Sequence, residues 1–557
     1  MKKKIFFLLT FFIYSSSNYS HCNEIYHSIQ PEKSSSKSLN RNMKSGSYSN
    51  FVVASANDYS TKIGYDILNM GGSVADAAVA IQLTLGLVEP QSSGLGGGLF
   101  LTYFDRRTNN VISFEGREKA PKNLKGNIFL KNDGSPKKFF DAVIGGSSVG
   151  VPSALKTLYA FHKLYGVLEW KDVIKPVINF SSNGFIPSSR LINALEKEKF
   201  LFSLYPDSFF GNIVKDPRKN FINNDYTETL VNISNDVSNF YSKKIAKDIV
   251  STVKKSKNPG KLSLNDLKDY TPVKSKALCY KLKIKFKICG PNLPTSGTIG
   301  IIQALILFES LIEKNVKPSL NDILEILNFV YYVRDKDLAD PDYSFIDVNQ
   351  LIDENYLIYN FEKFMKTNDF SLIENVNEIV NSTTHFSLVD KYKNVLSLTS
   401  SIESSFGSRL FTNGFFLNNQ LTDFSFKNID ESGNLIKNRP EPGKRPLSSM
   451  SPIIVFDENE NFFLTIGSPG GKAIISYVLK SLISVLYMNE DIETAIEKPN
   501  YIRIKGNTFI EEEYLNKEII QKGLKRDLTS GLVIINKTHN GYSASADSRR
   551  DGTVRGN

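Results

Sequence analysis

The strongest constraint on the fold lies in residues 382–403, where two strand-like runs flank a short turn. Side chains alternate between the two faces of a strand, so Thr399, Ser401 and Glu403 share one face of the second run. The pattern predicts a hairpin that brings two hydroxyls and a carboxylate close to Thr383, near the start of the first run. Taken alone, the cluster is also consistent with a structural polar ladder.

Helix-like and strand-like segments alternate along the rest of the chain. Apolar periodicity and capping residues predict helices at 58–70, 73–85, 153–165, 170–183, 244–255, 298–313 and 319–335. Strands are predicted at 99–104, 110–115, 384–390, 395–403, 452–456 and 461–466. No Gly/Ser linker interrupts residues 50–557, so we expect one folding unit of mixed α and β structure.

The N-terminus has the pattern of a secretory signal. Three lysines (2–4) precede a short apolar run from Ile5 to about Tyr14, which is too short to span a bilayer. We expect residues 1–21 to be a signal peptide, although an uncleaved anchor remains an alternative. Residues 22–49 are rich in Ser, Lys and Asn and are expected to be disordered. An exported protein, periplasmic or secreted, is predicted.

Composition excludes several classes of protein. The chain is 41% hydrophobic and 23% charged, as in ordinary globular proteins. Its net charge of +10 comes from lysines scattered along the chain, so we expect no nucleic-acid partner. Five histidines without ligand spacing argue against a metal site, and no cofactor is expected.

Three cysteines are too few for a disulfide scaffold or a four-thiolate zinc site. Cys279 and Cys289 flank an alternating run that can fold as a hairpin. A cross-strand disulfide and two free thiols are both consistent with this pattern.

Three short motifs resemble known catalytic loops. Ser148 lies in a G-x-S-x-G pattern, but the next predicted helix begins several residues too late for a nucleophile elbow. The glycines at 94–98 lead into a strand and predict a tight turn rather than a phosphate loop. The segment 467–473 lacks P-loop spacing, yet it joins a strand to a helix. Unshielded N–H groups at such a junction suit an oxyanion hole, although a simple turn remains an alternative.

Longer motifs give the chain a family resemblance over about residues 50–557. It resembles the γ-glutamyltranspeptidases in segments 71–78, 93–98, 117–121, 338–341, 383–390, 418–424, 444–450 and 467–471, in order and in spacing. The resemblance implies an N-terminal nucleophile hydrolase with a four-layer αββα sandwich. It also implies that the precursor cuts itself between Ser382 and Thr383, leaving a large subunit (50–382) and a small subunit (383–557) associated.

The same resemblance implies the chemistry. Thr383 would be the nucleophile, with its own freed α-amine as the base. Ser401 would bond the nucleophile, in place of the threonine of many members. The N–H groups of Gly470 and Gly471 would form the oxyanion hole.

The resemblance also implies a site for a free glutamyl head group. Arg117, Ser448 and Ser449 would hold its α-carboxylate, since an arginine fork suits a carboxylate. Acceptors and negative charge on Glu403, Gln420 and Asp423 would bind its α-ammonium.

Glutathione or other γ-glutamyl compounds are the expected donors, and water, amino acids or peptides the acceptors. An acylase or poly-γ-glutamate-cleaving enzyme of the same fold is the nearest alternative. A hydrolase using Ser148 and an unprocessed exported binding protein are two others. The segment 424–443 matches no lid sequence and has no tyrosine, which leaves the choice of acceptor open.

Overall fold

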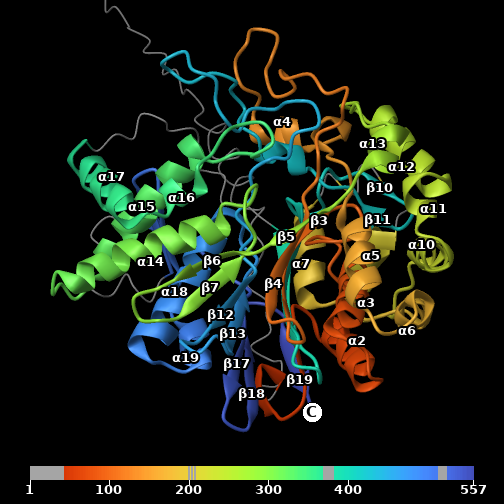
Figure 1. Ribbon diagram of the computed structural model, residues 1–557. Coiled ribbons are helices and arrows are strands. Elements are labelled where there is room, and N and C mark those ends of the chain that lie inside the picture. Colours follow the sequence, from red (N-terminus) through yellow and green to blue (C-terminus); the bar gives the residue numbers. More distant parts are fainter. Residues whose placement is uncertain (1–42, 199–200, 202–204, 206–208, 368–381, 512–523) are drawn as a thin grey trace, which may run out of the picture.

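The computed structural model describes residues 43–198, 201, 205, 209–367, 382–511 and 524–557. Two seven-stranded antiparallel sheets stack face to face, and helices cover the outer face of each (Figure 1). The layers therefore follow the order helix, sheet, sheet, helix, and the expected αββα sandwich is confirmed. The expected signal peptide and most of the segment 22–49 lie outside the described residues.

Sheet 1 holds the predicted hairpin at its centre. Its strands, in spatial order, are β19 (Thr553–Gly556), β2 (Val52–Ser55), β8 (Ser382–Val389), β9 (Val395–Glu403), β3 (Gly98–Asp105), β4 (Asn110–Gly116) and β5 (Val273–Lys276). Sheet 2 contains β1 (Ser45–Tyr48), β18 (Gly541–Ala546), β17 (Val533–Thr538), β13 (Phe462–Gly467), β12 (Ile453–Phe456), β7 (Lys287–Gly290) and β6 (Leu278–Lys281). Each sheet therefore takes strands from both sides of the Ser382–Thr383 bond.

Strand β1 corrects one expectation. We expected residues 22–49 to be disordered, but residues 45–48 pair with β18 along the edge of sheet 2. The sequence there is polar and lacks the apolar alternation of a buried strand. The strand is ordered because its main chain forms hydrogen bonds with β18.

Two helical layers enclose the sheets. Beside sheet 1 lie α2 (Asp58–Asn69), α3 (Val74–Val88), α5 (Ala154–Tyr165), α6 (Trp170–Asn183), α7 (Ser189–Lys197), α9 (Phe209–Lys215), α10 (Asn224–Asn235), α11 (Ser238–Tyr241), α12 (Lys244–Lys255) and α13 (Leu264–Asp269). Beside sheet 2 lie α14 (Gly297–Glu313), α15 (Leu320–Asp337), α16 (Val348–Leu351), α17 (Glu354–Thr367), α18 (Ile474–Met488) and α19 (Ile492–Glu497). All seven predicted helices and all six predicted strands are present, with small shifts at their ends.

Short elements complete the described chain. They are α4 (Phe139–Val143), η3 (Gly146–Ser148), η4 (Gln420–Asp423), η5 (Gly471–Ala473), the strand pair β10 (Phe411–Thr412) and β11 (Phe415–Phe416), and a small sheet of β14 (Tyr501–Ile504), β15 (Asn507–Ile510) and β16 (Leu524–Lys525). One segment, 471–488, is long and apolar enough to cross a membrane, but 72% of it is buried inside the protein, as in a core helix.

The period-two pattern explains how the hairpin is buried on both faces. Leu396 and Leu398 of β9 join the core beneath the helices of sheet 1. Ser397 and Thr399 alternate with them and face sheet 2, where the Ser397 hydroxyl donates to the carbonyl of Ile466 (3.2 Å). The polar face of the hairpin therefore forms hydrogen bonds across the interface between the two sheets.

The predicted hairpin that carries two cysteines is also present. Cys279 of β6 and Cys289 of β7 are directly opposite each other and form a disulfide. Of the two interpretations left open by the sequence, the structure therefore has the disulfide.

Candidate active site

A cavity of about 570 Å³ opens where β8 begins and β9 ends. Nine of the predicted site residues line it: Arg117, Thr383, Ser401, Glu403, Gln420, Asp423, Ser448, Ser449 and Gly471. Ser382 and Gly470 are adjacent in sequence to lining residues but are not part of the lining. The fold thus brings together side chains from segments more than 300 residues apart.

The hydroxyl of Ser401 connects the two residues of the predicted cleavage site. It donates to the carbonyl oxygen of Ser382 (2.9 Å) and lies 3.1 Å from the Thr383 hydroxyl. The N–H of Glu403 donates to the hydroxyl oxygen of Ser401 (2.9 Å). Because the one proton of Ser401 is directed to Ser382, the Thr383 hydroxyl is left to donate to Ser401. A register shift between Ser382 and Thr383 accompanies this arrangement.

Glu403 is a buried carboxyl at the end of β9. Its backbone has a positive φ of 76°, so the chain turns away from the strand at this residue. Its Oε2 accepts from the Ser404 hydroxyl (2.5 Å) and from the side-chain amide of Asn419. Burial, with the neighbouring Asp423 carboxylate adding to it, raises the pKa of Glu403 to about 8. Near pH 7 this site therefore favours the neutral acid until a cation comes close.

Arg117 lies immediately after β4 and is fully buried. Its guanidinium donates to Asp423 Oδ2 (2.6 Å) and to the carbonyls of Pro446 (2.9 Å) and Leu447 (2.8 Å). Gln420 donates to the same oxygen of Asp423 (2.6 Å). The residues predicted for opposite ends of the head group are thus in direct contact. This suits an α-amino acid, whose ammonium and carboxylate are attached to one carbon.

Ser448 and Ser449 precede β12 and form another part of the wall. The Ser449 hydroxyl accepts from Arg334 Nε (3.1 Å), and the same Nε lies 3.2 Å from Ser296 Oγ. Ser448 Oγ accepts from the N–H of Met450 (3.2 Å). Both hydroxyl protons remain available to a carboxylate in the cavity.

The loop between β13 and α18 has the predicted strand–turn–helix form. Gly470 and Gly471 both have positive φ, 138° and 53°, and η5 begins at Gly471. A Cβ on Gly470 would lie 2.5 Å from the Tyr477 ring, so a side chain there would collide as well as strain the backbone. The turn therefore requires glycine at these positions, and Gly471 lines the same cavity as Thr383.

The segment 424–443 borders the cavity, although its sequence matched no lid. Residues 424–427, 430–432 and 434–438 contribute to the lining. Phe426 stacks on Phe129 with ring centroids 4.5 Å apart, and the Asn438 amide donates to the carbonyl of Asp423 (2.8 Å). The wall on this side is therefore attached to both η4 and the chain after β4.

The other glycine motifs have structural roles. Ser148 is buried in η3, outside the cavity lining, and its hydroxyl lies 2.6 Å from the carbonyl of Val143 and 3.0 Å from that of Gly145. It is therefore not an exposed nucleophile. The 94–98 segment forms the predicted turn into β3, in which Gly97 N–H donates to the carbonyl of Gly94 (3.1 Å).

A buried ion pair joins two of the motifs. Arg445 bonds both oxygens of Asp340 (3.0 and 2.5 Å), and its main-chain N–H donates to the same carboxylate (2.8 Å). Arg445 also bonds Glu115 of β4 (2.6 Å). These contacts connect the segment that leads to Ser448 and Ser449 with β4 and with the chain after α15.

Removing one partner of that pair should strongly destabilise the protein. We expect Asp340→Ala to cost about 3–5 kcal/mol, because it leaves a buried guanidinium without its main counter-ion. The urea midpoint of unfolding measures this loss. The matched control is Asp66→Ala, which removes an exposed partner of Lys62 and should change the midpoint little. Equal small shifts for the two variants would contradict the proposed anchoring role of Arg445.

Sequence reasoning missed several residues around the site. Arg334 lies one turn before the 338–341 motif, but nothing in its helical pattern marks it as a cavity residue. Asn419 lies inside the 418–424 motif, but the sequence did not predict the hydrogen bond from its side-chain amide to the Glu403 carboxyl. Arg550, near the C-terminus, donates to the carbonyl of Thr383 (3.1 Å) and carries no local sequence signal.

Comparison with known proteins agrees with this geometry. The family model for gamma-glutamyltranspeptidase matches residues 60–556. The chain belongs to the γ-glutamyltranspeptidase family. It is 30% identical over 502 residues to the glutathione hydrolase proenzyme of Bacillus subtilis (strain 168), covering 85% of this chain and 84% of that one.

Solved structures of similar fold agree with this family membership. A gamma-glutamyltranspeptidase of Helicobacter pylori is 27% identical, covers 55% of this chain and 90% of its own, and has a TM-score of 0.51. A cephalosporin acylase from Bacillus halodurans has a TM-score of 0.77 over 92% of this chain and 96% of that one; at 18% identity it supports the fold alone. The chain is therefore an enzyme of the γ-glutamyltranspeptidase type with an N-terminal nucleophile hydrolase fold.

Proposed function

We propose that the chain is a proenzyme that cuts itself between Ser382 and Thr383 and then transfers γ-glutamyl groups through an ester on Thr383. The observation that carries this proposal is the Ser401 hydroxyl, which lies within hydrogen-bond distance of both the Ser382 carbonyl oxygen and the Thr383 hydroxyl. It can stabilise the oxygen that becomes negative and orient the group that attacks.

The cleavage step converts an amide into an ester and then into two chain ends. Thr383 Oγ1 attacks the carbonyl carbon of Ser382, the C–N bond breaks, and the hydroxyl proton passes to the departing nitrogen. Water then hydrolyses the ester, which leaves a carboxylate on Ser382 and a free α-amine on Thr383. In model compounds such an amine has a pKa near 8, so it can act as a base near neutral pH.

In the mature enzyme the Thr383 hydroxyl attacks the γ-carbonyl of the donor while the α-amine takes its proton. The N–H groups of Gly470 and Gly471 stabilise the oxyanion, and the amine returns the proton to the leaving amine. With glutathione as donor the leaving group is cysteinylglycine. Water or an amino acid or peptide acceptor then releases the γ-glutamyl group from Thr383.

The charged pair at the far side of the cavity supports selection of a free glutamyl head group. The α-carboxylate of the donor is held by Arg117 with Ser448 and Ser449, and the α-ammonium by Asp423 with Gln420 and Glu403. The high pKa of Glu403 fits this role, because a bound ammonium favours its ionised form and gains a second partner. The 424–443 wall has no tyrosine to cover the ester, so water has access to it.

We also propose export to the periplasm or outside the cell. The basic and apolar N-terminal pattern supports this, and the Cys279–Cys289 disulfide fits an oxidising compartment. The two fragments remain associated because each sheet contains strands from both of them.

A denaturing gel with N-terminal sequencing tests the proposal. Purified protein should give two bands, and the smaller should begin Thr-Thr-His-Phe, the sequence from Thr383. The same preparation should release p-nitroaniline from γ-glutamyl-p-nitroanilide. Full activity in an intact 62.5 kDa chain would overturn the proposal.

A further inference from the structure

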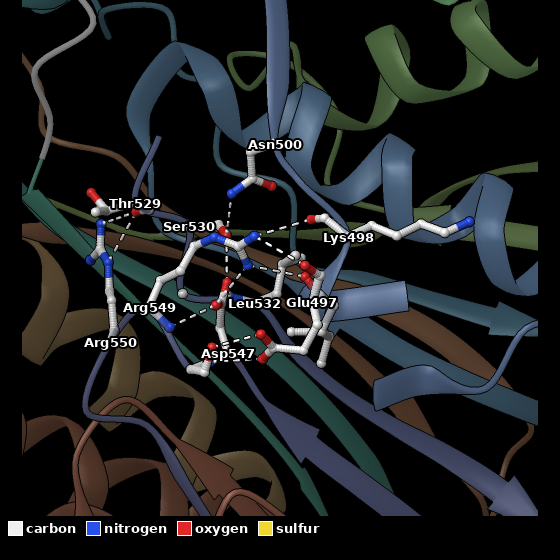
Figure 2. A network of polar contacts seen from close by, with 12 residues as sticks. Glu497, Lys498, Asn500, Thr529, Ser530, Leu532, Asp547, Arg549 and Arg550 are labelled. Carbon is white, nitrogen blue, oxygen red and sulfur yellow. Dashed lines mark hydrogen bonds and ion pairs between the residues drawn. The ribbon is translucent and has the colours of Figure 1, made fainter. Parts of the chain in front are cut away.

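Arg550 lies on the loop between β18 and β19, and Figure 2 shows its side chain next to Thr529. Its Nη1 donates to the carbonyl of Thr383 (3.1 Å), while its Nε and Nη2 donate to the carbonyl of Thr529 (3.2 and 3.0 Å). The side chain is buried. A guanidinium is therefore fixed next to the residue whose amine is freed by cleavage.

The neighbouring residues hold this loop in place. Arg549 bonds both oxygens of Glu511 (2.9 and 2.8 Å) and Oδ1 of Asp547 (3.1 Å). The other oxygen of Asp547 accepts from the Leu532 N–H (3.2 Å) and from the Ser530 hydroxyl, as Figure 2 shows. Arg549 is thus neutralised by two carboxylates, whereas the Arg550 side chain donates to the main-chain carbonyls of Thr529 and Thr383.

Resting on the function proposed above, we propose that Arg550 is a positioning residue whose positive charge keeps the freed α-amine of Thr383 in its neutral, proton-accepting form. A nearby like charge disfavours a second cation, and the bond to the Thr383 carbonyl fixes the guanidinium next to the residue that carries the amine. The hydrogen bond also fixes the main chain from which the amine and the hydroxyl project.

Two further groups of charged residues lie near Thr383. Arg190 of α7 pairs with Glu89 and reaches the cleavage site through Ser92, which the Ser382 hydroxyl contacts (3.2 Å). Burial raises the pKa of Glu89, while the neighbouring Arg190 lowers it. On β9, the carboxyl of Glu403 has a pKa of about 8 and is mainly neutral near pH 7.

The groups around Arg550 itself leave it charged. They are Asp551 and Asp547 on its own loop, Tyr477 of α18, Glu89 after α3 and Arg190 of α7. Burial, with Arg190 adding to it, lowers the pKa of Arg550 to about 9, which is still above neutral pH. The guanidinium therefore remains a cation in the range where the enzyme needs a neutral amine.

The sign of the expected pH effect follows from the role of the amine. The base works only when unprotonated, so kcat/KM rises with pH through the pKa of the amine. Removing the nearby cation raises that pKa and moves the acid limb of the profile to higher pH. A charge-conserving substitution leaves the limb in place.

Two variants of the mature enzyme separate charge from hydrogen bonding. Arg550→Gln keeps an amide donor without charge, and Arg550→Lys keeps charge with fewer donors. With γ-glutamyl-p-nitroanilide, we expect the acid-limb midpoint of kcat/KM to rise by about one pH unit in Arg550→Gln and to stay unchanged in Arg550→Lys. Equal midpoints in wild type and Arg550→Gln, or equal shifts in both variants, would overturn the proposal.

A direct titration covers the case in which Arg550→Gln does not mature. The rate at which a small anhydride modifies the Thr383 amine of the wild-type enzyme, followed by mass spectrometry of the small fragment, gives the pKa of that amine. We expect a value below the usual range of about 7.7–8.0, and a value within or above it would overturn the inference. Absence of a fragment beginning at Thr383 would instead defeat the proposed cleavage, so the two failures are distinguishable.

Discussion

Replacing Thr383 with alanine should leave the precursor as a single chain with no measurable transfer or hydrolysis of γ-glutamyl donors. The variant lacks the hydroxyl that attacks the Ser382 carbonyl, and it lacks the nucleophile of the mature enzyme. Both losses follow from one side chain, so we expect at least a ~10³-fold fall in kcat/KM, since the acyl-enzyme route is closed. A denaturing gel and a p-nitroaniline release assay measure the two effects.

Thr384→Ala is the matched control for this substitution. Thr384 is the next residue of β8, is equally buried, and its hydroxyl makes no hydrogen bond within the described part of the chain. Its side chain is on the opposite face of the strand from Thr383. The control should cut itself and keep its activity. A normal two-fragment pattern in Thr383→Ala would remove Thr383 from the cleavage step.

Replacing Arg117 should raise KM for γ-glutamyl donors far more than it lowers kcat. The guanidinium is expected to supply two charge-assisted hydrogen bonds to the α-carboxylate, so their loss in Arg117→Ala should cost about 3 kcal/mol, or ~100-fold in KM. Arg117→Lys keeps the charge but not the planar fork and should have an intermediate effect. Steady-state kinetics with γ-glutamyl-p-nitroanilide check both values.

Self-cleavage should continue in the Arg117 variants, because the hydrogen bonds of this side chain go to Asp423, Pro446 and Leu447 rather than to the cleavage site. Arg107→Ala is a suitable control, since that arginine is exposed on the turn after β3. Unchanged donor affinity in Arg117→Ala would contradict the carboxylate role. Lost maturation would show that the ion pair with Asp423 supports the precursor instead.

Much of the local structure follows from the sequence. The hairpin around Thr383 was predicted because period-two alternation is a direct consequence of strand geometry. The start of α3 follows from the sequence for a similar reason: Ser73 and Asp76 form a capping box through groups only three residues apart. The strand–turn–helix at 467–473 was recognised because glycine relieves a constraint on the backbone itself.

The resemblance to a family selected site residues that no local pattern identifies. Arg117 and Asp423 are 306 positions apart in the chain, and neither periodicity nor spacing links them. Nine of the predicted site residues line one cavity. Ser148 fits a short catalytic motif, yet the fold uses its hydroxyl to bond two carbonyls of its own loop.

The sequence by itself determined the helices and strands with the clearest periodicity, the glycine turns, and the place where a hydroxyl-rich hairpin begins. Only the tertiary structure decided that β1 pairs with the edge of sheet 2, that Arg117 contacts Asp423, and that Arg550 lies beside Thr383. Local patterns depend on geometry repeated every two to four residues. Contacts between distant residues depend on how whole layers pack, and that arrangement is set by the chain as a whole.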